Sequence, residues 1–197
     1  MKPEKIAALL VLFSILVGCM SAPRERYYAL SADLATPSVA QNAPARYGVV
    51  IGPITIPDVV DRPQMVVLKS ASEVSVAEQS RWAEPLAGGI ARVVADNLVH
   101  LLSGAQVSSF AQSRTVTADY RVVVDVQHFD AIAGEGIRDE FSWTVRAAHK
   151  DGAVKSGRTV AREAANSSEY AELVAAHNRA LATLSRDIAK AIEAMPR

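Results

Sequence analysis

The sequence lacks most of the residues and motifs that build catalytic or metal sites. It has one cysteine, Cys19, in 197 residues, so it cannot form an internal disulfide framework. Its four histidines, His100, His128, His149 and His177, share no close spacing, and we find no H-E-x-x-H, G-x-S-x-G or phosphate-binding P-loop motif. We therefore predict that the protein is not an enzyme and has no catalytic residues, metal site or bound cofactor.

Net charge and long apolar runs are also missing. The 21 basic and 21 acidic side chains balance, which gives no general attraction to nucleic acid or to anionic lipid. We therefore expect no nucleic-acid partner. Residues 6–17 form an apolar run that is shorter than the ~20 residues a transmembrane helix needs, and no later run reaches that length.

That short apolar run is typical of a secretory signal peptide. Lys2 and Lys5 supply a positive flank before it, and small residues follow it. The segment ends in Leu16-Val17-Gly18-Cys19, which resembles the bacterial lipobox. An alternative is a plain secreted protein that happens to keep one thiol, which would be a liability in an oxidising compartment.

The lipobox resemblance implies a covalent lipid on Cys19, the predicted lipidation site. Residues 1–18 would be removed, and several acyl chains would hold the protein stably to a membrane. Met20 rather than Asp follows the cysteine. By resemblance to enterobacterial sorting, this implies the outer membrane, with the protein on its periplasmic face.

We divide the remaining chain into two parts. Residues 19–46 contain the lipidated cysteine, a short strand near 27–30, and a tether poor in large apolar side chains. Residues 47–197 are expected to form one globular domain, a size that can bury a hydrophobic core.

Periodicity predicts the elements of that domain. Alternating or β-branched runs indicate strands at 47–56, 65–68, 73–76, 106–110, 119–129, 141–147 and 154–163. Gly52-Pro53 indicates a break in the first of them. Apolar stripes at helical spacing predict helices over 82–102 and after Asn166, where Asn166 and Glu169 resemble a capping box. The predicted fold class is α+β, a mixed, largely antiparallel sheet with two long helices on one face.

Several polar and aromatic positions have simple structural explanations. His177 lies on the apolar stripe of the last helix, so we expect a buried histidine with one hydrogen-bond partner. Asp139 and Glu140 fall at predicted strand ends and are expected to be solvated. Trp82 and Trp143 lie at helical or alternating positions, which favours core packing over ligand binding.

Three stretches together carry a family resemblance. They are YYAL at 27–30, PDVVDRPQMV at 57–66 and RWAEPL at 81–86. In this order, on a lipoprotein of this size, they resemble the ABC-type transport auxiliary lipoproteins, the PqiC (YmbA)-like family. One departure is Val59-Val60, where the family pattern has an aromatic residue and a leucine.

The resemblance implies partners and a role. Such proteins accompany an MCE-domain protein and its ABC transporter, which move phospholipid or other hydrophobic molecules between the two envelope membranes and support membrane integrity. The lipoprotein would dock on the MCE partner at the outer membrane.

The residues themselves suggest which side chains could make that contact. A loop between Pro57 and Pro63 presents a polar set, and function concentrates on such loops. This candidate partner-binding set is Asp58, Asp61, Arg62 and Gln64. The alternative is that Asp61 and Arg62 only shape the turn through local hydrogen bonds.

A second candidate set lies at the start of the first predicted helix. It comprises Arg81, Trp82 and Glu84. Here the alternative is a helix cap with a local ion pair. Two other functions remain open, a lipid-binding carrier with its own apolar cavity and a structural envelope lipoprotein, and the sequence also leaves a homo-oligomer open.

Overall fold

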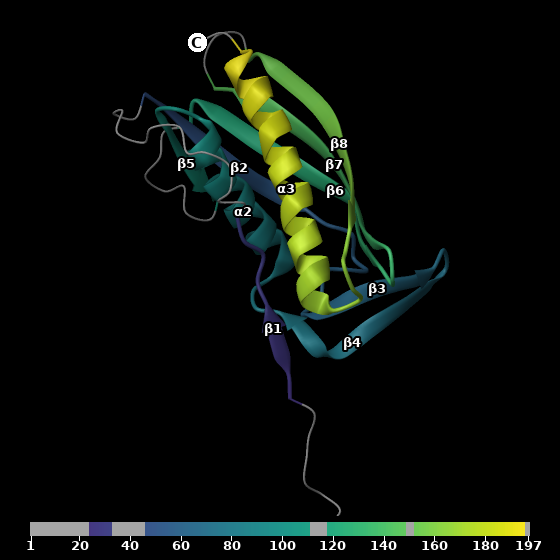
Figure 1. Ribbon diagram of the computed structural model, residues 1–197. Helices are drawn as coiled ribbons and strands as arrows, with labels where there is room; N and C mark the ends of the chain where they lie inside the picture. The colour runs from purple at the N-terminus through teal and green to yellow at the C-terminus, as the bar shows by residue number, and fades with distance from the viewer. Residues whose placement is uncertain (1–23, 33–45, 111–117, 149–151, 196–197) are drawn as a thin grey trace, which may run out of the picture.

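The computed structural model describes residues 24–32, 46–110, 118–148 and 152–195. Within them, eight strands form one mixed sheet, and two helices lie over one of its faces (Figure 1). The elements in chain order are β1 (Arg26–Tyr28), β2 (Tyr47–Thr55), β3 (Gln64–Ser70), β4 (Glu73–Trp82), α2 (Leu86–Leu101), β5 (Ala105–Ser109), β6 (Tyr120–Ile132), β7 (Gly136–Ala147), β8 (Val154–Ala164) and α3 (Tyr170–Glu193).

Strand β6 organises the sheet. Its first half pairs in parallel with β2, and its last residues pair in parallel with β3, while β7 runs antiparallel along its other edge. Strand β5 lies next to β2, and β8 lies next to β7. On the side of β3, β4 comes next and β1 lies beyond it. The longest ladders are the antiparallel ones of β6, β7 and β8, so the predicted α+β class is confirmed.

The alternation that predicted β6 is the alternation that buries it. Val122, Val124 and Val126 face the helices and are almost fully buried, while the residues between them face the other side. The β6–β7 register shifts between Val126 and His128, and this shift turns Phe129 and Ala131 back into the core.

The predicted break in the first long strand is also present. Gly52 has a φ of 119°, a conformation that favours glycine, and the Gly52–Pro53 peptide bond is cis. The register of β2 against β6 shifts between Ile51 and Ile54. The strand therefore continues past the break with its alternation reset.

Both helix starts differ from the prediction. Helix α2 begins at Leu86, because Pro85 sits at its N-cap in an extended conformation. Helix α3 begins at Tyr170 with Glu169 at its N-cap and no side-chain capping bond. The expected capping box is wrong, because the Asn166 amide donates to the Glu172 carboxylate at 3.3 Å instead.

Trp143 is packed across the outer strand. It lies opposite Gly157 in the β7–β8 register, and a Cβ added at Gly157 would fall 2.3 Å from the indole ring. The indole N–H donates to the Thr159 hydroxyl at 3.1 Å. Glycine at this position therefore makes room for the ring, and packing rather than ligand binding explains Trp143.

Helix α3 supplies much of the core. Its apolar stripe, including Leu181, Leu184 and Ile188, is buried against β7, β8 and α2. No helix in the described part of the chain is long and apolar enough to cross a membrane.

Candidate docking surface

The three motif stretches meet at one end of the molecule. Strand β1 pairs in parallel with the end of β4, which places Tyr28 opposite Trp82. The same part of β4 runs antiparallel to the start of β3, which places Arg81 opposite Gln64. This end carries β1, and the C-terminal end of α3 lies at the opposite end (Figure 1).

Main-chain hydrogen bonds join the three stretches directly. The Trp82 N–H donates to the Pro63 carbonyl at 2.7 Å, and the Ala83 N–H donates to the Tyr28 carbonyl at 2.8 Å. Two of the stretches, 57–66 and 81–86, line an open hollow of about 360 Å³, which we call the motif hollow. Its lining residues are Asp61, Arg62, Pro63, Trp82, Ala83, Glu84, Pro85 and Leu86.

The loop that borders the motif hollow is closed by its own main chain. The N–H groups of Val60 and Asp61 donate to the Pro57 carbonyl at 3.0 and 3.2 Å, and the Arg62 N–H donates to the Val60 carbonyl at 2.9 Å. The side chains of Asp58, Asp61 and Arg62 are exposed and make no hydrogen bond or ion pair with a described residue. Side-chain bonds between Asp61 and Arg62 therefore do not shape this turn.

The charged residues of the second candidate set have separate partners. Arg81 pairs with Glu25 beside β1 at 3.0 Å. Glu84 pairs with Arg92 of α2 at 2.6 Å, and the same guanidinium donates to the Leu30 carbonyl at 2.8 Å. The hydrogen bond that Arg92 donates to Glu84 raises the pKa of Arg92 above its ordinary value. Glu84 is thus in an ion pair that fixes α2 to the segment after β1, and it does not cap the helix.

Trp82 forms the floor of the motif hollow. Its side chain is 8% exposed and packs edge-on against Phe129 and His177, with ring centroids 6.2 and 6.4 Å apart. The core-packing interpretation of Trp82 is therefore confirmed, although the ring also lines the hollow. Gln64, from the first candidate set, is half-buried beside it on β3.

A buried ionisable pair lies beneath this floor. The His177 Nδ1 is 2.8 Å from the Asp139 Oδ2, and both side chains are almost completely buried. The imidazole stacks on Phe129 at 3.9 Å and 8°. Burial raises the pKa of Asp139, and the neighbouring His177 partly offsets the rise. The other oxygen of this carboxylate has no partner among the described residues.

The two expectations for this pair had different outcomes. His177 is buried with one hydrogen-bond partner, as predicted. The prediction that Asp139 is solvated is wrong, because it lies inside β7 and faces α3. Sequence reasoning missed it because its partner is 38 residues away.

Comparison with known proteins identifies the family. The family model described as "ABC-type transport auxiliary lipoprotein component" matches residues 28–189. This chain belongs to that family. No curated protein sequence matches it.

Two solved structures share the fold of this auxiliary lipoprotein. An uncharacterised protein has a TM-score of 0.71 and 19% identity, and the match covers 86% of this chain and 99% of the other. Protein XCC0632 from Xanthomonas campestris has a TM-score of 0.62 and 20% identity, over 83% of this chain and 92% of the other. At these identities the likeness shows the fold alone.

The departure from the family pattern falls at the edge of the motif hollow. Val60 is 7% exposed and packs into the core, whereas Val59 is 42% exposed on the loop surface. At position 59, where the family pattern has an aromatic residue, this auxiliary lipoprotein therefore has a smaller apolar side chain that contacts solvent.

Two further parts of the prediction concern lipid and metal. The predicted lipidation site, Cys19, lies outside the described residues. Across the ranges that the structure describes, no group of three or more His, Cys, Asp or Glu side chains could hold a metal ion.

Proposed function

We propose that this lipoprotein is anchored in the outer membrane through Cys19 and acts as the periplasmic docking component of an MCE-type ABC transport system. The system would move phospholipid or other hydrophobic molecules between the envelope membranes. The lipoprotein performs no catalysis. It holds the far end of the transport path at the membrane.

One observation carries this proposal. The chain matches the transport auxiliary family over residues 28–189, and its three motif stretches are joined at one end of the molecule, where two of them line one hollow. A set of residues that is scattered in sequence and joined on one surface is what a partner-binding site requires.

The geometry of the loop supports a docking role. Its turn is already closed by main-chain hydrogen bonds, so the loop has little conformational freedom to lose on association. The Arg62 guanidinium is exposed and has no ion-pair partner among the described residues. Such a planar group can bind a carboxylate or a main-chain carbonyl of the partner.

The anchor is tested by substituting its cysteine. Cys19→Ala should retain the signal segment and incorporate no labelled fatty acid, because the acyl acceptor is gone. Met20→Asp is the matched control and should keep the label but move to the inner membrane in sucrose-gradient fractions. Equal labelling of Cys19→Ala would contradict the anchoring site.

The docking role is tested by capture of the partner. Tagged lipoprotein, purified from mildly solubilised membranes, should bring with it an MCE-domain protein identified by mass spectrometry. Recovery of folded, lipidated protein without any MCE-domain protein, under conditions that keep the transporter intact, would argue against docking. A lipid-binding carrier would instead co-purify with lipid and without that partner.

A further inference from the structure

The face of the sheet that the helices leave uncovered carries an unusual set of charges. Outward positions of β6, β7 and β8 alternate with the buried ones, and we call this surface the open face. Apart from His128, its basic side chains are arginine: Arg121, Arg138, Arg146, Arg158 and Arg162. Arginine is the residue that best matches phosphate and carboxylate groups, because it offers two parallel donors.

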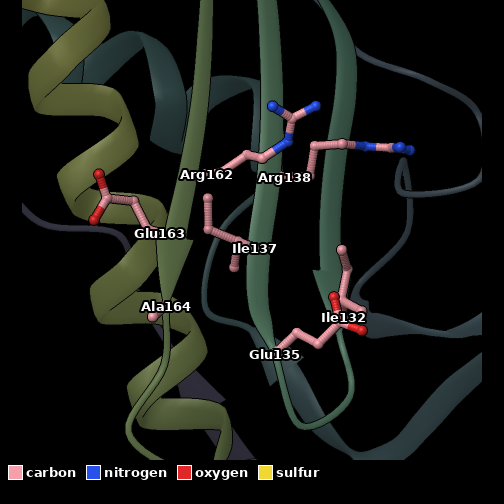
Figure 2. A pocket seen from close by; sticks show the side chains of 7 residues that line it. All are labelled: Ile132, Glu135, Ile137, Arg138, Arg162, Glu163 and Ala164. Atoms are coloured by element: carbon pink, nitrogen blue, oxygen red, sulfur yellow. The ribbon is translucent and has the colours of Figure 1, made fainter.

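Four of these arginines form two directly opposed pairs, Arg121 with Arg146 and Arg138 with Arg162. Arg138 on β7 is the register partner of Arg162 on β8, and both line an open hollow of about 360 Å³. Figure 2 shows both side chains at the same end of this hollow, with the Arg162 guanidinium over β7 and the Arg138 guanidinium over β6. Like charges at directly opposed positions destabilise a sheet unless an anion lies between them.

The two carboxylates of the open face nearest to Arg138 and Arg162 already have arginine partners. Asp130 accepts from the Nη2 and Nε of Arg138 at 2.6 and 3.2 Å, and Glu140 pairs with Arg158 at 2.6 Å. Arg162 makes no hydrogen bond or ion pair with any described residue. All five of its N–H donors are therefore available to a ligand.

The two other carboxylates of the hollow do not neutralise this pair. Glu163 accepts from the Arg179 Nε at 2.9 Å and points toward α3 (Figure 2). Glu135 lies at the β6–β7 turn, at the end of the hollow away from the guanidinium groups (Figure 2). Ile132 supplies apolar lining between that turn and the arginines, whereas the Ile137 side chain at the border of the hollow is buried in the core.

We propose that the hollow between Arg138 and Arg162 binds a phosphate group that is carried on an organic stem. The phosphate oxygens would accept from both guanidinium groups, and the stem would contact Ile132. The phosphate could belong to a lipid headgroup or to a soluble phosphate ester. This inference goes beyond the docking role, because it concerns a different surface and different residues.

Two ligands distinguish a lipid headgroup from a soluble phosphate ester as the source of the phosphate. The full mature lipoprotein in neutral detergent is titrated with glycerol 3-phosphate by calorimetry. Separately, it is mixed with micelles containing phosphatidic acid, or diacylglycerol as the phosphate-free control, and retained lipid is measured by native mass spectrometry. Binding of both phosphate ligands would show that the phosphate group suffices. Binding of one alone would identify lipid or soluble ester as the source.

The variants test the site itself. Arg162→Gln should weaken binding about tenfold or more, the loss expected when a charge-assisted hydrogen bond is removed. Arg146→Gln is the matched control, because it also removes an exposed arginine. Arg146 lies on β7, opposite Arg121 at the far end of the same face. It should change binding less than about twofold, since the binding groups remain in place. Glu135→Gln should strengthen binding slightly, because a nearby negative charge is removed.

Three results would overturn the proposal. They are no binding of either phosphate ligand, unchanged binding by Arg162→Gln, and an equal loss in Arg146→Gln. Circular dichroism of each variant confirms that the fold is retained. Capture of the MCE-domain partner should be unchanged in Arg162→Gln, so the outcome is independent of the proposed docking role.

Discussion

The end of the molecule around the motif hollow and the β6–β7–β8 meander with α3 are stabilised in different ways. In the meander, packing of buried side chains stabilises the structure. Phe141, Leu184 and the His177–Asp139 pair, for example, are fully buried between sheet and helix. In the loop at the motif hollow, main-chain hydrogen bonds close the turn, and the charged side chains extend into solvent.

This difference separates stability from binding. A side chain that supports the core cannot change without loss of stability, whereas Arg62 has no such role within the described residues. We therefore expect substitutions in the meander to lower the free energy of unfolding. Substitutions of the exposed charged residues in the loop should alter partner binding alone.

The largest effect is expected from Phe141→Ala in the meander. Phe141 is 0% exposed, and removing its ring leaves a cavity that typically costs about 3–5 kcal/mol of unfolding free energy. Phe110→Ala, at a side chain that is 54% exposed, is the control and should cost far less. Urea denaturation measures both, and similar losses would show that burial of the side chain does not set the cost.

A smaller loss is expected from Gly157→Ala, also in the meander. The new methyl group would lie 2.3 Å from the Trp143 ring, so the ring must move and its bond to Thr159 must break. Overpacking of this kind costs about 1–3 kcal/mol. Tryptophan fluorescence should shift at the same time, and an unchanged spectrum with unchanged stability would contradict the described packing.

How far the sequence predicted these two regions also differs. The meander and α3 follow from local patterns, because alternation and the apolar stripe of α3 are both set by burial of neighbouring residues. The pairing of Tyr28 with Trp82 joins residues far apart in the chain through main-chain atoms, which leave no side-chain pattern to read. Family resemblance selected the three stretches, but only the structure shows that they touch.

Buried polar residues were the weakest part of the sequence-based prediction. Asp139 has the same local context as the half-buried Arg138 and Glu140 beside it, and only the position of His177 on α3 makes its burial tolerable. The ion pairs of Arg81 and Glu84 were likewise unpredictable, because Glu25 lies on a separate segment and Arg92 is two helical turns away.

The buried His177–Asp139 pair makes the stability of the meander depend on pH, and the loop has no such pair among the described residues. Because the pKa of Asp139 is raised in the folded state, the folded protein binds the proton more tightly than the unfolded chain. Stability from this group is therefore lost as the pH rises from the ordinary aspartate pKa, about 3.9, through the raised value.

Asp139→Asn isolates that dependence, because an amide can still bond to His177 but does not titrate. Urea denaturation between pH 4 and pH 7 should show the stability of Asp139→Asn improving relative to the parent as the pH rises. If the difference in unfolding free energy between the two proteins stays constant over this range, the raised pKa of Asp139 is refuted.

The smallest effect on stability, and the most direct test of the account, is expected from Arg62→Ala. We predict a thermal midpoint nearly equal to that of the parent, since exposed side chains without partners contribute within about 0.5 kcal/mol. We predict also a clear loss of captured MCE-domain protein when equal amounts of folded lipoprotein are compared. A lowered midpoint with full capture by the folded fraction would contradict the central claim, that the loop at the motif hollow binds a partner and does not stabilise the fold.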